Sequence, residues 1–219
     1  NLLNNTYIEE RKFRNFYDPL FQLNQDLNLL QFRKKIINIR GFWQNPTCYI
    51  SYLENYMSSF IDTKNLIPKN IEPGKYITIH IRREDYYLNK KSVNKYFSKF
   101  SPLKFILLSL QLLPQNYQNM PIILLSDDLS WKLKIVKILQ KSTNKKITYI
   151  KNTNKFQDWS ILRHSSINIC SNSTFSYSAA LLNIENINSK LRCIMPQWIE
   201  NNETAFEKGW LNPEGFIEI

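Results

Sequence analysis

The stretch Tyr76–Tyr86, YITIHIRREDY, decides the fold, because an apolar strand runs directly into a histidine, two arginines and two acids. Isoleucines at 77, 79 and 81 alternate with polar residues that include His80 and Arg82, which is the period of a β-strand with two unlike faces. Arginine presents a planar fork of donors that suits phosphate oxygens, and open α/β sheets bind ligands beyond the carboxyl ends of their strands. Two interpretations fit this stretch: an anion-binding strand end, or a surface edge strand whose arginines pair with Glu84 or Asp85.

Pro73-Gly74 is a turn-forming pair that ends the preceding segment. After it, the same strand begins a regular alternation of strands and helices. The pattern predicts strands over 76–82, 121–126, 147–150, 167–171 and 191–195, and helices over 102–113, 129–142, 156–166 and 173–182. Such an alternation implies right-handed crossovers and a parallel sheet. We therefore expect an α/β, Rossmann-like domain over 74–219. Helical spacing over 20–30 and 49–60 predicts a mainly helical segment before it.

Composition narrows the possible functions. The 219 residues are 43% hydrophobic and 14% aromatic, which indicates a globular chain and excludes a disordered one. Only four glycines argue against a Gly-rich phosphate loop, so phosphate binding would depend on side chains or helix ends. The net charge of +11 suggests an acidic partner such as a nucleotide, a nucleic acid or an anionic lipid surface. Because the lysines are scattered and no nucleic-acid-binding signature is present, nucleic acid is a minor alternative and we predict no such partner.

Cysteines and apolar runs say little about compartment. Cys48, Cys170 and Cys193 are far apart and lack the spacing of a zinc site or a disulfide framework, so we predict reduced, buried thiols. The longest apolar run, Phe105–Leu113, is too short to cross a bilayer, and the N-terminus lacks the order of a signal peptide. The chain begins with Asn1 rather than Met, as a fragment would.

A second predicted strand ends in Ser126-Asp127-Asp128, with Trp131 one turn into the next helix. Several roles fit these residues. Asp128 or Ser126 caps the helix, or the acidic pair binds a ribose hydroxyl or a base, or it supports the two arginines electrostatically. Spacing does not choose between these roles, although capping is the expected role for one of the residues.

A third strand end carries the run SNSTFS at 171–176, directly before an apolar helix. Small hydroxyl residues cap helices, and the same free N–H groups and hydroxyls can hold a phosphate. With the arginines of the first strand, this makes two candidate anion-binding strand ends in one sheet, which capping alone does not explain.

Together these segments resemble the ordered motifs of the α-1,2-fucosyltransferases of glycosyltransferase family 11. The matching segments are His80–Tyr86 (HIRREDY), Ser126–Trp131 (SDDLSW) and Asn172–Ser176 (NSTFS), with Gly41–Gln44 (GFWQ) upstream and Pro196–Trp198 and Gly209–Trp210 at the end. Glu84 stands where the family has glycine, and Tyr177 and Ser178 replace a pair of tryptophans. The family's Gly-rich opening segment is absent, so we expect that the chain lacks the N-terminal portion.

The resemblance implies a two-domain (GT-B type) glycosyltransferase that moves L-fucose from GDP-β-L-fucose to the 2-hydroxyl of a galactoside, with inversion and without metal or cofactor. Residues 74–219 would form the GDP-sugar-binding domain, and 1–73 a helical remainder of the acceptor side and a linker. No Asp-x-Asp triplet is present, so arginine and N–H or hydroxyl donors would meet the charge of the leaving diphosphate.

By the same resemblance, Arg82 contacts the β-phosphate, Ser173 and Thr174 add donors, and His80 with Asp158 reads the guanine. The other donor-site residues that it implies are Arg83, Asp127, Asp128, Asn172 and Phe175. Among these, we expect Arg83 to brace its loop through an acidic neighbour.

The general base is the least determined role. Asp85 is the candidate, with an ion pair to the arginines as its alternative, or the base lies in the missing portion. We expect His164 to be a buried, hydrogen-bonded structural histidine, and Asp158 has helix capping as its alternative.

The expected partners are GDP-fucose and a galactose-containing glycan, in a bacterial cytoplasm or at the inner face of its membrane, where basic charge meets anionic lipid. A nucleotide- or glycan-binding remnant without turnover is the alternative function.

Overall fold

The computed structural model describes residues 63–84, 101–183, 185–186, 188–196 and 214–219, together with four short strands outside these ranges. By internal contacts the chain divides into two compact units, Asn1–Ser58 and Ser59–Ile219. In the first unit, β1 (Thr6–Glu9) and β2 (Ile37–Arg40) pair in parallel. The helical spacing at 20–30 and 49–60 lies outside the described residues, so the helical segment and its assignment to an acceptor side stay predictions.

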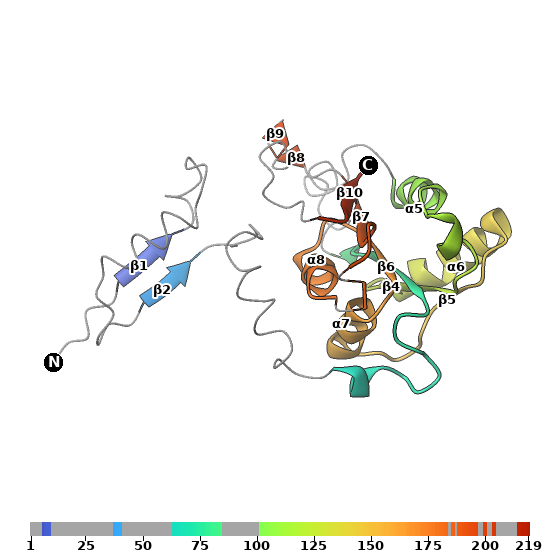
Figure 1. The fold of residues 1–219 in the computed structure, drawn as a ribbon, viewed down its shortest axis with the longest axis horizontal. Helices are drawn as coiled ribbons and strands as arrows, with labels where there is room; N and C mark the ends of the chain where they lie inside the picture. The colour runs from blue at the N-terminus through green and yellow to red at the C-terminus, as the bar shows by residue number, and fades with distance from the viewer. Residues whose placement is uncertain are drawn as a thin grey trace. The chain divides into compact units, whose positions relative to one another are not determined.

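The second unit contains a six-stranded parallel sheet in the order β10-β7-β6-β3-β4-β5 (Figure 1). Its strands are β3 (Ile77–Ile81), β4 (Ile122–Ser126), β5 (Ile147–Thr148), β6 (Ile167–Cys170), β7 (Cys193–Met195) and β10 (Phe216–Glu218). The connecting helices are α5 (Pro102–Gln111), α6 (Leu129–Thr143), α7 (Lys155–Arg163) and α8 (Thr174–Leu181). The short elements are the 3₁₀ turns η3 (Lys64–Leu66) and η4 (Gln115–Tyr117) and the antiparallel pair β8 (Ile199–Glu200) and β9 (Glu203–Thr204). The predicted α/β, Rossmann-like sheet is confirmed.

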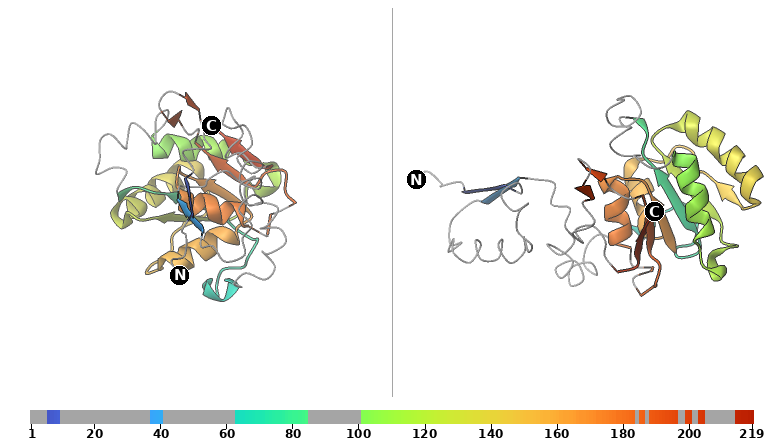
Figure 2. Two further views of the ribbon diagram at one scale, coloured as in Figure 1. Left: turned by 90° about the vertical axis from the view of Figure 1, so that its left-hand side faces the viewer. Right: turned by 90° about the horizontal axis from the view of Figure 1, so that it is seen from above.

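The helices cover both faces of the sheet (Figure 2, right). On one face, α5 and α6 pack against the isoleucines of β3 and form the larger apolar cluster. On the other face, α7 and α8 contribute to a smaller cluster with Tyr76 and Leu125. A strand that is covered on both faces is buried along its whole length, as β3 is.

The edge-strand interpretation of Tyr76–Tyr86 is therefore wrong. β3 lies between β4 and β6, and its polar residues are buried rather than solvent-facing. Thr78 has no exposed surface, and its hydroxyl donates to Asn168 Oδ1 of β6 at 2.7 Å. Ser165 donates to the same oxygen at 3.0 Å. Hydrogen bonds across the sheet thus replace solvent on the polar face.

Helix α7 ends earlier than predicted, because the residues after Arg163 turn back toward β6. The Ser166 amide donates to the Tyr76 carbonyl at 2.7 Å, and the Ser166 hydroxyl donates to the carbonyl of Gly74. These bonds connect the start of β6 to the start of β3, so 164–166 cannot continue the helix.

Candidate functional site

Three polar segments of the sequence meet at the carboxyl edge of the sheet. β4 and β6 flank β3, and His80 is in register with Leu125 of β4 and Cys170 of β6. The parallel pairing brings the residues that follow all three strands to one edge. The strand order also reverses here, since the chain runs from β3 outward to β5 and then returns to the other side of β3 with β6. Such switch points are where open α/β sheets bind ligands.

Backbone hydrogen bonds hold the two arginines in place. The Arg82 amide donates to Ser171 Oγ at 3.0 Å, while the Ser171 amide donates to the His80 carbonyl at 2.9 Å. The Arg83 amide donates to Asp127 Oδ1 at 2.7 Å. Side chains from the ends of β4 and β6 therefore fix the loop after β3 from both sides.

Arg83 is braced by the acidic pair. Its Nε donates to Asp128 Oδ2 at 3.1 Å, and its guanidinium carbon lies 4.7 Å from the centroid of a Trp131 ring. Asp128 also caps α6, because its Oδ1 accepts from the Trp131 amide at 2.9 Å and from the Ser130 hydroxyl at 2.8 Å. Burial alone would raise the pKa of the Asp128 carboxyl, but these hydrogen bonds and the Arg83 charge lower it. Among the roles open to the acidic pair, the structure contains the helix cap and the support of Arg83.

His80 is a neutral polar group inside the site. It is 7% exposed, and its ring centroid lies 5.4 Å from that of Phe175. Burial, and then the charge of Arg82, lowers the pKa of His80 to about 3. Among the described residues its Nδ1 finds no hydrogen-bond partner. The ring can thus donate or accept a hydrogen bond near neutral pH, but it supplies no positive charge.

The N-terminus of α8 has an unused hydroxyl. Ser173 is the N-cap residue, yet its side chain makes no capping bond, and its buried Oγ has no partner in the described part of the chain. The first amides of a helix lack partners within the helix and carry its positive dipole end. Ser173 and the exposed Thr174 that follows it therefore provide hydrogen-bond donors next to Ser171, the residue that holds the Arg82 amide.

Asp158 lies in the first turn of α7 but does not cap it. Asn154 is the N-cap and forms a capping box with Gln157, so the capping alternative for Asp158 is wrong. Burial raises the pKa of Asp158, while a hydrogen bond from Thr153 and the charge of Lys132 lower it. In the described residues, the buried Oδ1 of Asp158 has no hydrogen-bond partner.

The model of glycosyl transferase family 11 matches residues 25–214, a range that includes all three strand-end segments. The chain belongs to glycosyl transferase family 11. None of the curated proteins matches it. Membership makes the chain a glycosyltransferase, whose substrates are a nucleotide-sugar donor and a glycan acceptor.

Further sequence predictions for this transferase concern a candidate base, the cysteines, metal binding and membrane spans. Asp85 falls in the part that is not described, as does Cys48. Cys170 and Cys193 are free and buried, as predicted. Across the described ranges, no cluster of three or more His, Cys, Asp and Glu side chains is arranged to hold a metal ion, and no helix is long and apolar enough to span a bilayer.

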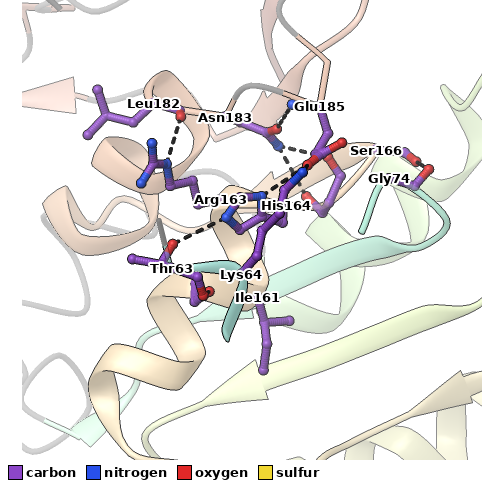
Figure 3. A network of polar contacts seen from close by, with 12 residues as sticks. Thr63, Lys64, Gly74, Ile161, Arg163, His164, Ser166, Leu182, Asn183 and Glu185 are labelled. Atoms are coloured by element: carbon purple, nitrogen blue, oxygen red, sulfur yellow. Dashed lines mark hydrogen bonds and ion pairs between the residues drawn. The ribbon is translucent and has the colours of Figure 1, made fainter. Parts of the chain in front are cut away.

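His164 is structural, as predicted, and lies at the amino edge of the sheet. It is 1% exposed, with Nε2 3.2 Å from Thr63 Oγ1 and Nδ1 3.1 Å from Glu185 Oε1 (Figure 3). Its carbonyl accepts from the Gly74 amide at 2.8 Å. The network ties the segment before β3 to the end of α7, far from the strand ends that carry the arginines.

The sequence pattern did not single out Ser171. Ser171 belongs to a run of small hydroxyl residues that a helix cap accounts for, and only the register of β3 and β6 shows that its hydroxyl meets Arg82.

Proposed function

We propose that this glycosyltransferase binds GDP-β-L-fucose at the carboxyl edge of β3, β4 and β6, and that it transfers L-fucose to the 2-hydroxyl of a galactoside. The observation that carries the proposal is the anchoring of Arg82 by Ser171, next to the Ser173 hydroxyl, which has no hydrogen-bond partner within the described part of the chain. A fixed arginine beside hydroxyl and helix N-terminal donors suits a diphosphate. The resemblance to α-1,2-fucosyltransferases supports the choice of donor and linkage. It also supports our proposal that the enzyme has the two-domain GT-B fold.

In the proposed reaction, the acceptor O2 attacks C1 of fucose from the face opposite the diphosphate. The bond between C1 and the β-phosphate oxygen breaks, its electron pair leaves with GDP, and the O2 proton passes to a general base. The configuration at C1 inverts from β to α. Arg82 and the donors of the α8 N-terminus stabilise the charge that develops on the β-phosphate, so no metal is required. Asp85 remains the candidate base.

Fixed donors are more effective than mobile ones, because they need no reorganisation as the charge develops. The Arg82 backbone is held by Ser171, and the adjacent Arg83 is held by Asp127 and Asp128. His80 is neutral and retains hydrogen-bonding capacity, which suits a nucleoside rather than a phosphate. With Asp158, it is proposed to contact the guanine.

The test is calorimetric titration with GDP and GDP-fucose, with ADP and UDP as controls and a chelator present, followed by a transfer assay on galactosides. Arg82→Ala should abolish donor binding and transfer while the protein stays folded. Arg82→Lys should also fail, because a point charge cannot reproduce the guanidinium fork. Lys141→Ala removes an equal charge from an exposed position in the last turn of α6 and should change neither. Full activity in Arg82→Ala would refute the phosphate role, and GDP binding without transfer would indicate a binding remnant.

The location at an inner membrane surface is a separate proposal, which the net charge of +11 supports. Co-sedimentation with vesicles that contain anionic lipid should exceed that with neutral vesicles and should fall as salt is raised. Equal binding to both kinds of vesicle would contradict it.

A further inference from the structure

The parallel sheet gathers lysines that are scattered along the sequence. Its strands all run in one direction, so the residues that precede them meet at one edge, the amino edge. Lys75 stands two residues before β3, Lys146 directly before β5 and Lys190 three residues before β7, and all three side chains are exposed. Four strand spacings separate β7 from β5, so these lysines spread positive charge over about 19 Å of the edge.

Backbone hydrogen bonds hold two of these lysines at the edge. The Ile122 amide, at the start of β4, donates to the Lys146 carbonyl at 2.9 Å. The Ser166 amide, just before β6, donates at 2.7 Å to the carbonyl of Tyr76, the residue after Lys75. Both bonds join neighbouring strands where they begin. The sheet therefore fixes where the two ammonium groups emerge, although the lysine side chains themselves are flexible.

Two further lysines add to the charge of the amino edge. Helix α6 runs back from the carboxyl edge, and Lys141 is exposed in its last turn. Lys145 lies between α6 and β5, and its Nζ donates to Gln118 Oε1 at 2.8 Å. Because Gln118 precedes β4, this bond keeps a positive charge beside the start of that strand.

The acids at this edge offset only part of the charge. Glu185 forms an ion pair with Lys64 at 3.1 Å, so its charge is already balanced. Among the described residues, the other acids near the strand starts are Glu72 and Glu214. The lysines outnumber them, and the edge keeps a net positive charge.

An anionic lipid surface fits this edge better than a nucleic acid does. Lysines near an anionic leaflet are attracted without needing a matched partner for each charge. Leu112, at the end of α5, is 46% exposed on the same edge and adds an apolar side chain that can enter the headgroup region. In the described ranges, the exposed aromatic side chain is that of Phe156, at the start of α7 and thus at the other edge. The described part of the amino edge therefore offers nucleobases no platform for stacking.

We propose that the amino edge of the sheet is the surface by which this transferase docks on an anionic lipid membrane, with Lys75, Lys146 and Lys190 facing the phospholipid headgroups. The inference rests on the proposed location at a membrane and names the surface that meets the lipid. β3 has five residues, so the arginine loop lies about 17 Å from this surface, at the opposite end of the strand. A docked enzyme would keep its donor site open to a water-soluble nucleotide sugar.

The test is co-sedimentation of the full chain with vesicles of phosphatidylcholine alone or of equal parts phosphatidylcholine and phosphatidylglycerol. The amino-edge variant combines Lys75→Gln with Lys146→Gln, and the control combines Lys151→Gln with Lys155→Gln, two exposed lysines near the carboxyl edge. The amino-edge variant should bind anionic vesicles about 10- to 30-fold more weakly, because each lysine near such a surface contributes about fivefold. The control has the same net charge but should stay within about twofold of the unmodified chain, since its lysines lie more than a screening length from the lipid. GDP affinity should be unchanged in both variants.

Several results would overturn the assignment. Equal losses in the two variants would refute it, because net charge rather than this edge would then drive binding, and unchanged binding in both would refute it too. If the unmodified chain does not prefer anionic vesicles, the proposed location fails together with the inference, while GDP titration of the same proteins tests the donor site separately. Binding to duplex DNA but not to vesicles, with loss in the amino-edge variant, would assign the edge to nucleic acid instead.

Chemical labelling tests the same surface without any substitution, which decides the matter if circular dichroism shows that the amino-edge variant does not fold. Anionic vesicles should protect Lys75, Lys146 and Lys190 of the unmodified chain from acetylation, whereas Lys151 and Lys155 should react as they do without lipid. Equal labelling of the first three lysines with and without vesicles would refute the docking surface.

Discussion

Replacing Asp128 by alanine should destabilise the sheet-bearing unit by about 1.5 to 2 kcal/mol. The magnitude has two sources. The residue is the N-cap of α6, and losing a side-chain cap costs about 1 kcal/mol. Its ion pair with Arg83 joins side chains that are 26% and 16% exposed, so screening by water limits that contribution to about 0.5 to 1 kcal/mol. For a domain of this size, the melting temperature should fall by roughly 3 to 8 °C.

Asp128→Ser separates the two contributions. Serine caps helices as well as aspartate does but carries no charge, so this variant should lose only about 0.5 to 1 kcal/mol. Urea denaturation at pH 7, followed by far-UV circular dichroism, gives the unfolding free energies, and unchanged m-values would show that the comparison is sound. An alanine variant within about 0.3 kcal/mol of the unmodified chain would refute the reasoning from the cap. A serine variant as unstable as the alanine variant would show that the charge, and not the cap, matters.

The same variant tests how the arginine loop is held. In Asp128→Ala the Arg83 side chain loses a partner, but the amides of Arg82 and Arg83 keep their bonds to Ser171 and Asp127. Nucleotide affinity should therefore fall by less than about tenfold, the equivalent of 1.4 kcal/mol. A loss as large as that of Arg82→Ala would mean that the backbone bonds are insufficient to position the loop.

Three further predictions concern pH, base choice and metal. The pKa of His80 falls from 6.5 to about 3 on folding, so between these values the unfolded chain binds more protons, and the free energy of unfolding should drop by about 2 kcal/mol from pH 7 to pH 5. The His80→Gln variant should not show this decrease in urea titrations at the two pH values. The pKa shifts of other groups, such as Glu218, are common to both proteins and cancel in the comparison. Asp158→Asn should exchange a preference for GDP for one for xanthosine diphosphate, because the amide can donate to O2 of xanthine; retained GDP selectivity in competition binding would contradict the role of the carboxylate. Removing divalent metal with a chelator should leave donor affinity and transfer unchanged, and recovery of lost activity by added Mg²⁺ would refute metal independence.

Local pattern predicted the elements of the sheet but not the order of its strands. The isoleucine alternation identified β3, and the expected capping residue marked the start of α6. The burial of Thr78 could not be predicted, because its hydrogen-bond partner Asn168 is 90 residues away. β10 was missed since three residues carry too little periodicity, and it forms only by pairing with β7.

The candidate site was predictable to a similar degree. The segments that contribute the arginines and the hydroxyls stand out in the sequence, because their residue types suit phosphate. Asp127 accepts a hydrogen bond from the Arg83 amide, whereas Asp128 accepts one from the Arg83 side chain. Only the folded loop determines which carboxylate faces which donor.

The central position of β3 has a consequence for biosynthesis. Its pairing with β4 needs only the crossover through α5, whereas β6 is added from a much later part of the chain. Before residue 167 is available, the ITIHI segment is an apolar edge strand with unpaired amides and carbonyls, which other chains can pair with. Insertion of β6 also depends on distant contacts, which form slowly. We therefore expect aggregation during synthesis or refolding to begin at β3, so that cooler, slower expression improves the yield of soluble transferase more than changes to its surface do.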